Sequence, residues 1–484
     1  MTSQSSGESL SLTRHVFVFC LLAATAFAAG PKERTLYNFQ AAPDGINPQA
    51  PLLAGGGHLY GTTITGGAGT VCQDLYSTGC GAVFELTPPA SPGGSWTEKV
   101  IYSFQGGSDG ALPSGQLLRD GAGNLYGTTM AGGSSGLFCT GFQATGCGTV
   151  FRLSPPQTAG GDWTESIVYV FQGGSDGKEP FNAGLISDGK GKLYGTTSSG
   201  GGGYCSGLGT GCGSVFRLSQ PATPGGPWTE TILYGFNGNG GNFSDGAFPA
   251  ASLVFDQKGN LYGTTFNDGP GGCSDESCGG TIFRLSPPAV DGDPWTETLL
   301  AYFGSGTTNN DSFPSGRVIF DQKGNLYGTT KLGGSGACDD QSSYAFPSCG
   351  TVFGLSPTTS GVWTLTTLYS FTGGSDGGYP EGGLTMDSKG NLYGIAPKGG
   401  GQGSCTLISG ISEFGCGTVF ELTPPATTGA AWTETTLHAF SGSDGATPNA
   451  GLILKNGVLY GTTSGTGMAI QFPINNGTVF AILP

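Results

Sequence analysis

Seven aspartates recur at one position per repeat, and they are the residues whose type and spacing could do chemistry. Each lies in a loop that also carries Pro and, in six of the seven, a Gly directly after the acid: Asp44, Asp109, Asp176, Asp245, Asp311, Asp376 and Asp444. Carboxylate oxygens are what hard cations such as calcium bind. An Asp before Gly also makes an Asx-turn, in which its side chain accepts from amides of its own loop. The sequence therefore leaves two interpretations, a cation or ligand site and turn formation.

Twelve of the thirteen cysteines fall in six close pairs, and each pair follows one copy of a repeated Tyr-Gly segment. The pairs are Cys72 with Cys80, Cys139 with Cys147, Cys205 with Cys212, Cys273 with Cys278, Cys338 with Cys349, and Cys405 with Cys416. A zinc site needs four ligands together, whereas each loop offers two thiols and no histidine. Behind a secretory signal, an even number of paired cysteines predicts disulfides.

Groups for catalysis are scarce. The chain has three histidines, too few to argue for a Ser-His-Asp or Cys-His arrangement. Nearly all acids occupy a repeated turn or strand position, whereas an active site usually needs one irregular constellation. The sequence favours a non-catalytic protein and predicts no cofactor, with calcium at the aspartates as the one candidate.

The elements that must position these residues are set by a repeat. The segment Leu261-Tyr262-Gly263-Thr264-Thr265 has near copies that begin at Leu59, Leu125, Leu193, Leu261, Leu326, Leu392 and Leu459, with spacings of 65 to 68 residues. Each repeat reads as four short apolar or β-branched strands separated by Gly, Pro, Asn and Asp. Four strands repeated seven times predict an all-β fold, a seven-bladed β-propeller.

The two ends of the chain support closure of the ring. The last repeat stops after its third strand, and residues 34–39 match the missing fourth strand. We therefore expect a last blade made from both termini, which removes an exposed sheet edge. Six fourth strands open with a tryptophan, and only the N-terminal one lacks it: Trp96, Trp163, Trp228, Trp295, Trp363 and Trp432.

Two further repeat positions carry expectations about local structure. The Gly in the middle of each second strand, such as Gly263, predicts close approach of a neighbouring backbone, from a stacked blade. The acids Asp120, Asp188, Asp256, Asp321 and Asp387 predict hairpin turns, and the last repeat has Asn456-Gly457 there, a strong two-residue hairpin signal. In the propeller, the cysteine loops and the loops with the seven aspartates should emerge on the same face, with the aspartates around one mouth of the channel.

The repeat resembles the GloVer tandem repeat of bacterial "choice-of-anchor" proteins over residues 34–483. The matching features are Gly-Asn-Leu-Tyr-Gly-Thr-Thr, then Cys-Gly-Thr-Val-Phe, then Trp-Thr-Glu, then Gly-Gly-Ser-Asp-Gly. The resemblance implies a secreted or surface-located bacterial protein and carries no particular activity with it. Many relatives resemble proteins that end in an anchoring or sorting segment; no such segment is expected after Pro484, so the resemblance does not extend to attachment to the envelope.

The N-terminus is typical of a secretory signal. Arg14 and His15 precede an apolar run, Val16 to Ala28, which ends in small residues. We therefore expect a signal peptide at 1–28, one propeller domain at 29–484, and an extracellular or periplasmic location. The run is short for a membrane span, and the chain has no second one.

The net charge of −15 argues against nucleic-acid binding, which needs Lys and Arg against phosphates. The function predicted from the sequence is a secreted, monomeric binding or scaffold propeller that recognises a glycan or an extracellular protein on its loop face. A secreted polysaccharide-active enzyme and a structural envelope or adhesion component are the alternatives, because propellers host all three.

Overall fold

The computed structural model describes residues 32–484, except 71, 73–78, 92–93, 134–138, 140–145, 159, 203–204, 206–210, 224, 239–244, 268–278, 305–311, 337, 339–347, 402–404, 406–414, 428 and 466–475. By its contacts the chain divides into Met1–Gly30 and Pro31–Pro484. The predicted signal peptide at 1–28 lies outside the described residues. Among the described residues, no helix is long and apolar enough to cross a membrane.

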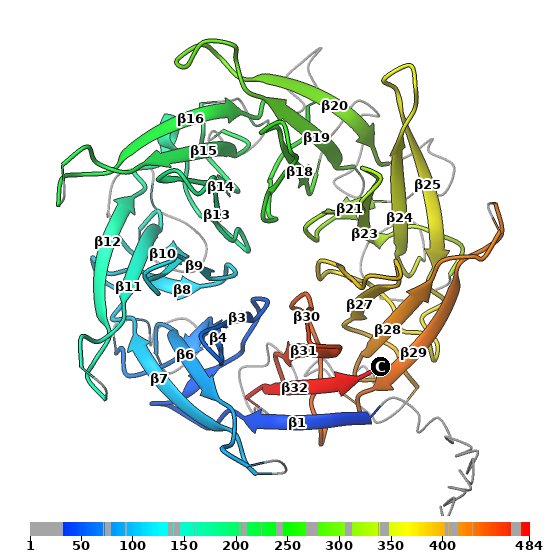
Figure 1. Cartoon of the computed structure of the whole chain (residues 1–484), viewed down its shortest axis with the longest axis horizontal. Coiled ribbons are helices and arrows are strands. Elements are labelled where there is room, and N and C mark those ends of the chain that lie inside the picture. Colours follow the sequence, from blue (N-terminus) through cyan, green and yellow to red (C-terminus); the bar gives the residue numbers. More distant parts are fainter. Residues whose placement is uncertain are drawn as a thin grey trace, which may run out of the picture. The chain divides into compact units, whose positions relative to one another are not determined.

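The described chain forms seven antiparallel sheets arranged as the blades of a β-propeller (Figure 1). The third strands, with a strand paired on each side, are β6 (Ala82–Thr87), β11 (Thr149–Ser154), β15 (Ser214–Ser219), β19 (Thr281–Ser286), β24 (Thr351–Pro357), β28 (Thr418–Thr423) and β32 (Thr478–Leu483). The outermost strands are β7 (Thr97–Ser103), β12 (Thr164–Val170), β16 (Thr229–Gly235), β20 (Thr296–Tyr302), β25 (Trp363–Ser370), β29 (Thr433–Ala439) and β1 (Lys32–Asn38).

The inner half of each blade is the hairpin of its first two strands. The second strands are β4 (His58–Thr63), β10 (Leu125–Ala131), β14 (Lys192–Thr197), β18 (Leu261–Thr265), β23 (Leu326–Leu332), β27 (Leu392–Ala396) and β31 (Val458–Thr463). The innermost strands are β3 (Leu53–Gly55), β9 (Leu118–Arg119) with β8 (Ala111–Pro113), β13 (Ile186–Ser187), β17 (Val254–Phe255), β22 (Ile319–Phe320) with β21 (Ser312–Pro314), β26 (Thr385–Met386) and β30 (Ile453–Lys455). A short pair, β2 (Gly45–Ile46) with β5 (Thr65–Gly66), and one helical turn, η1 (Gly174–Asp176), complete the described elements.

The ring closes as predicted. Strand β1 pairs antiparallel with β32, so the order in the seventh blade is β1-β32-β31-β30. In Figure 1 the blue first strand lies beside the red last strand. Because β1 covers the free edge of β32, the last blade has the same four strands as the others.

Phenylalanine fills the contacts between blades. Each outer strand is followed by a buried Phe whose ring meets the Phe of the next blade's third strand, with centroids 5.0–5.3 Å apart: Phe39–Phe84, Phe104–Phe151, Phe171–Phe216, Phe236–Phe283, Phe303–Phe353, Phe371–Phe420 and Phe440–Phe480. The predicted tryptophans make a second set of contacts, as where Trp295 packs on Tyr194 of the preceding blade. The apolar core is therefore repeated at every blade junction.

The neighbour that requires glycine in the middle of each second strand is not the one expected. A Cβ on Gly263 would lie 2.6 Å from Cζ of Phe283 and 2.9 Å from a methyl of Leu253, both in the same blade. The close neighbour is thus a phenylalanine ring from the paired third strand, and the expectation of a neighbouring backbone was wrong. Since the same ring packs on the next blade, Gly makes the space for the interblade contact.

The hairpin turns are confirmed. Asp256 accepts hydrogen bonds from the amides of Lys258 (2.8 Å) and Asn260 (2.9 Å), and the turns at Asp120, Asp188, Asp321 and Asp387 share this pattern. In the last blade, Asn456 and Gly457 have φ of 53° and 78°, as a two-residue hairpin with positive φ at both positions requires.

Candidate functional site

Six of the seven predicted loop aspartates lie in one repeated arrangement, and Asp311 lies outside the described residues. Each carboxylate accepts a hydrogen bond from a tyrosine hydroxyl or, in the last pair, a histidine nitrogen of the preceding outer strand: Tyr37–Asp44 (2.8 Å), Tyr102–Asp109 (3.1 Å), Tyr169–Asp176 (2.7 Å), Tyr234–Asp245 (2.6 Å), Tyr369–Asp376 (3.0 Å) and His438–Asp444 (3.0 Å). Each also accepts from the amide of a residue three to eight positions earlier, as Asp44 does from Gln40 (2.7 Å). The aspartates therefore form turns; a calcium site on them stays a prediction.

The structure places these carboxylates at the outermost strands, not around a mouth of the channel. The hydroxyl that holds Asp44 belongs to Tyr37 of β1, and the hollow beside it is also lined by Glu98 and Val100 of β7. The physical reason is the hydrogen bond that each carboxylate accepts from a backbone amide just after the outer strand. A carboxylate that accepts from an amide just after the outer strand must stay beside that strand.

A glutamate from the next blade faces each of these aspartates, and sequence reasoning missed it. It is the Glu of Trp-Thr-Glu or its equivalent in β1, and its charge interacts with the aspartate in six pairs: Glu98–Asp44, Glu165–Asp109, Glu230–Asp176, Glu297–Asp245, Glu434–Asp376 and Glu33–Asp444. We call these the interblade acid pairs. Paired carboxylates between two packed elements resist ionising together.

Burial and the facing aspartate raise the pKa of these glutamates. Burial is the larger cause, and the pKa of Glu165 and of Glu297 rises to about 7 and that of Glu230 to about 8. One oxygen of each of these three carboxyls is buried and makes no hydrogen bond within the described part of the chain. An unpartnered buried oxygen costs less on a neutral acid than on a charged carboxylate. We infer that these glutamates hold a proton near neutral pH.

The junction of the fourth and fifth blades lacks this arrangement. Ala301 stands where five other outer strands have Tyr, Leu365 replaces the Glu, and Ser312 replaces the Gly after Asp311. The three departures occur together, which is the signal in the sequence that Tyr, Asp-Gly and Glu form one unit. This coincidence indicates that the three positions are linked, but without the fold it does not indicate that the Asp and the Glu, about 55 positions apart, lie next to each other.

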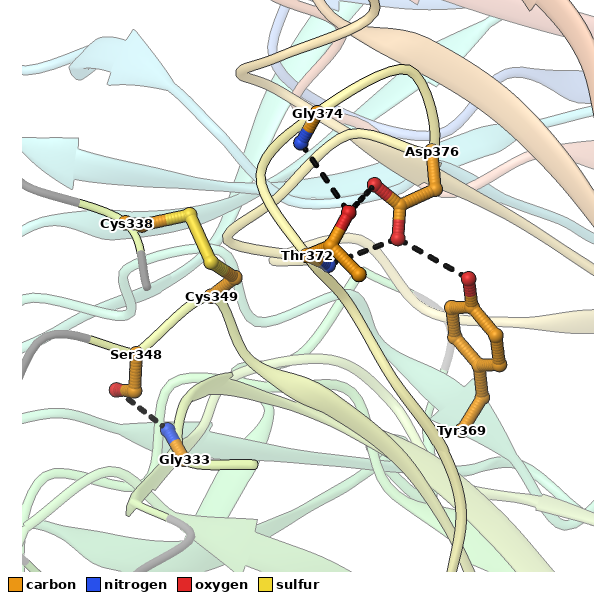
Figure 2. The surroundings of a disulfide bond; sticks show 8 residues. All are labelled: Gly333, Cys338, Ser348, Cys349, Tyr369, Thr372, Gly374 and Asp376. Atoms are coloured by element: carbon orange, nitrogen blue, oxygen red, sulfur yellow. Dashed lines mark hydrogen bonds between the residues drawn. A yellow bond between two sulfur atoms is a disulfide. The ribbon is translucent and has the colours of Figure 1, made fainter. Parts of the chain in front are cut away.

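Five of the six predicted disulfides are present, and Cys273 and Cys278 lie outside the described residues. The five are Cys72–Cys80, Cys139–Cys147, Cys205–Cys212, Cys338–Cys349 and Cys405–Cys416. Figure 2 shows Cys338–Cys349 beside the loop of Asp376, whose carboxylate accepts from Tyr369 and from the amide and hydroxyl of Thr372 (2.8 and 2.6 Å). Each disulfide closes the loop between the second and third strands. Disulfides of this kind persist in oxidising compartments.

Both sets of loops lie at one end of the blades, as predicted. In the fourth blade, Thr265 pairs with Thr281 and Thr281 with Tyr302, so the cysteine loop and the loop after the outer strand share one end. The Pro-rich linker from Ser286 to Thr296 lies at the other end. We call the first end the loop face.

Seven non-glycine residues on the loop face share a left-handed backbone. Each directly precedes a Pro, has φ between 53° and 63°, and donates its amide to a carbonyl at the end of the cysteine loop or its equivalent (2.7–3.0 Å): Asn47, Leu112, Glu179, Phe248, Phe313, Tyr379 and Thr447. This conformation is costly for a residue with a Cβ, and such strain concentrates at ligand-binding positions. The frame is constant, whereas the side chain that it presents differs in nearly every blade.

Replacing Thr447 with glycine is expected to stabilise the protein by about 0.5–1 kcal/mol, because glycine adopts positive φ without the Cβ cost and loses part of that gain to its greater freedom in the unfolded chain. Thr447 is half-buried and has φ of 53°. Urea unfolding measures the change. Thr447→Ala keeps the Cβ and should bring no gain; equal stabilisation by both variants would contradict the strain.

Four aromatic residues gather at some of the blade junctions, so the loop face differs in its side chains from blade to blade. The amide of Phe266 donates to the carbonyl of Phe248 (3.1 Å), and the ring of Phe266 stacks on Phe313 with centroids 4.8 Å apart and an angle of 25°. Phe313 and Tyr379 belong to one small apolar cluster, and the ammonium of Lys398 lies 5.0 Å from the ring of Tyr379. We call Phe248, Phe266, Phe313 and Tyr379 the aromatic arc. Phe248 and Phe266 are half-exposed, whereas Phe313 and Tyr379 are buried beneath the surface of the arc, which occupies the junctions of blades three to six.

The fold and the repeated junctions define a seven-bladed β-propeller built from tandem repeats. The family model described as the Gloeobacter/Verrucomicrobia repeat matches residues 23–205, 69–338, 136–408 and 206–480, and the chain belongs to this family. This agrees with the resemblance seen in the sequence. No curated protein matches the sequence.

Solved structures with a similar fold have little sequence in common with this chain. A fungal alcohol oxidase of the AA5 family, in complex with copper, is 14% identical with a TM-score of 0.50, and the match covers 94% of this chain and 76% of that one. The PQQ-bound aldose sugar dehydrogenase of Streptomyces coelicolor is 13% identical with a TM-score of 0.42, over 77% and 93%. A family AA12 enzyme of Trichoderma reesei is 13% identical with a TM-score of 0.39, over 94% and 96%. At such identities the likeness concerns the fold alone.

Proposed function

We propose that this protein is a secreted, non-catalytic propeller that binds a glycan on its loop face. The observation that carries the proposal is the aromatic arc, whose half-exposed members, Phe248 and Phe266, are accessible to a ligand on an otherwise repeated face. Aromatic surfaces with a few fixed polar groups are typical of binding sites, and flat rings stack on the apolar faces of sugars. Asn47, Glu179 and Thr447 would supply polar contacts elsewhere on the same face.

The loop face is held rigidly by its surroundings, which favours a role in binding over one in catalysis. Prolines after the variable residues pack on the glycines that follow the cysteines, as Pro249 does on Gly213. The five disulfides close the neighbouring loops. The six loop aspartates that the structure describes are held in turns by two or more hydrogen bonds each, which leaves them poorly placed as free acids or nucleophiles. A pre-formed surface binds with less ordering cost.

Secretion is part of the proposal. The apolar N-terminal segment predicts export, and five disulfides suit an oxidising extracellular or periplasmic compartment. A monomer remains the expected state, because a closed propeller leaves only short, protected blade edges.

The test is an array of bacterial and plant glycans probed with the wild-type protein and with two loop-face variants. Phe266→Ser and Phe248→Thr introduce residues that the repeat already uses at the equivalent positions, Ser198 and Thr447. Both should fold and should lower affinity at least about tenfold, since stacking on one ring contributes on the order of 1 kcal/mol or more. Val290→Ser, at a 65% exposed residue of the opposite end, is the control and should bind normally.

Three results would point elsewhere. Binding that survives both loop-face substitutions would contradict the proposed site. Hydrolysis or oxidation of a bound glycan would favour the enzyme alternative. Failure to bind any glycan, with saturable binding of an extracellular protein that Phe266→Ser abolishes, would keep the loop face and change the ligand.

A further inference from the structure

One junction of the ring presents an imidazole where five others present a phenol. His438 of β29 replaces the Tyr of five other outer strands, and its Nε2 lies 3.0 Å from Oδ2 of Asp444. The ring packs edge-on against Phe440, with centroids 4.8 Å apart, which fixes its orientation. This junction lies between the sixth and seventh blades, where the ring closes.

Glu33 completes a group of three ligands at this junction. It comes from β1, the N-terminal strand of the seventh blade. One ligand atom each from Glu33, His438 and Asp444 lies within 4.8 Å of the other two, and all three residues are half-buried. Two ligands come from near the C-terminal end of the chain and one from near the N-terminal end.

Neighbouring groups hold the two carboxylates and leave an oxygen of Asp444 for the shared site. The hydroxyl of Thr35 donates to Oε1 of Glu33 (3.2 Å), and the amide of Ser441 donates to Oδ1 of Asp444 (2.8 Å). Oδ2 of Asp444 faces the imidazole. Secondary hydrogen bonds of this kind orient metal ligands and tune their affinity.

We propose that Glu33, His438 and Asp444 form a site for zinc or a similar divalent transition metal. Imidazole nitrogen and carboxylate oxygen bind zinc at about 2.0–2.2 Å, and two ligand atoms on a tetrahedral ion are about 3.3 Å apart. The spacing of His438 and Asp444 already fits, and Glu33 needs only a small side-chain movement. The metal ties β1 to the sixth blade and so strengthens ring closure.

The other junctions are internal controls for this proposal. Five of them pair the same two carboxyl positions with a neutral phenol, which donates a hydrogen bond and is a poor metal ligand at neutral pH. The histidine therefore gives this junction a nitrogen ligand for a metal, which the junctions with a phenol lack. This inference does not depend on the proposed glycan binding.

The test is a zinc titration of the full-length, chelator-treated protein by calorimetry, with thermal unfolding in parallel. We compare the wild type with His438→Tyr, which restores the residue of five other blades and should fold. Glu33→Gln removes the third ligand, and Tyr102→Phe removes the equivalent ring-to-Asp hydrogen bond at another junction as a control. Cobalt(II) absorption reports whether the ion has nitrogen and oxygen ligands.

The wild type and Tyr102→Phe should bind one zinc ion in the same affinity class, and His438→Tyr should lose at least about 100-fold in affinity. Zinc at 100 times its dissociation constant should raise the melting temperature by about 3 °C in the wild type and leave His438→Tyr unchanged. Equal zinc binding by the wild type and His438→Tyr overturns the proposal. So does the absence of a saturable heat in the wild type.

Discussion

Replacing Phe440 with alanine is expected to lower the free energy of unfolding by about 3–5 kcal/mol, the largest effect of any single substitution considered for this protein. Phe440 is fully buried, and its ring meets Phe480 edge-to-face with centroids 5.1 Å apart. The substitution removes the ring from the junction between blades six and seven. A cavity remains, because two sheets pinned into a closed ring have little room to move together.

Urea unfolding followed by tryptophan fluorescence measures this change. Val362→Ala, at a residue that is 63% exposed, is the matched control and should stay within about 0.5 kcal/mol of the wild type. A loss below about 1 kcal/mol for Phe440→Ala would show that the junction collapses around the cavity. The interblade phenylalanines would then contribute far less than their burial implies.

Stability is expected to fall as the pH rises from 5 to 8.5, because of the interblade acid pairs. Burial and the facing aspartates raise the pKa of Glu165 and Glu297 to about 7 and that of Glu230 to about 8, above the ordinary value of 4.5. The folded protein then binds more protons than the unfolded chain between these values. The contribution of these groups is fully present below pH 4.5 and is lost as the pH passes through 7 to 8.

The single variant that isolates this effect is Glu230→Gln, which keeps the shape of the side chain and removes its ionisation. At pH 8.5 it should be more stable than the wild type by about 1–2 kcal/mol, after allowance for solvent screening of a partly exposed group. At pH 5 the two should be nearly equal. Thermal unfolding across the pH range is the measurement, and Asp162→Asn, at an exposed acid, is the control.

Adding calcium distinguishes the two interpretations of the interblade acid pairs, which either retain a proton or bind a calcium ion. If they hold protons, millimolar calcium at pH 8.5 should leave the melting temperature unchanged. A saturable rise that Glu230→Gln reduces would establish the predicted calcium site, with the aspartate and the glutamate of the next blade as ligands. Flat stability from pH 5 to 8.5 without calcium would contradict the raised pKa values.

Most of the fold could be predicted because its strands and turns depend on residues that are adjacent in sequence and because the same pattern recurs in every repeat. A strand needs only five or six β-branched or aromatic residues and a turn at each end, and the turn residues Asp256 to Asn260 are adjacent in sequence. Ring closure was also predictable, because the orphan strand at residues 34–39 and the truncated last repeat complement each other. Nearby cysteines indicated the disulfides for the same reason.

The candidate site was predicted only in part. The aspartates were found because they recur, but their position beside the outer strands depends on a hydrogen bond from a Tyr seven residues earlier, as from Tyr102 to Asp109. The aromatic arc escaped notice because Phe248 and Phe313 belong to different repeats and meet through Phe266. Their shared positive φ before Pro has no distinct signature in residue type.

The sequence by itself determined the number of blades, their strands and turns, the closure of the ring and the pairing of cysteines, since each depends on residues close together or on the repeat. Only the tertiary structure decided which side chains from neighbouring blades face each other. Glu230 meets Asp176, Phe236 meets Phe283, and Glu33 meets His438 across almost the whole chain. Contacts between blades depend on how two sheets pack, and packing between separate segments leaves little trace in a single sequence.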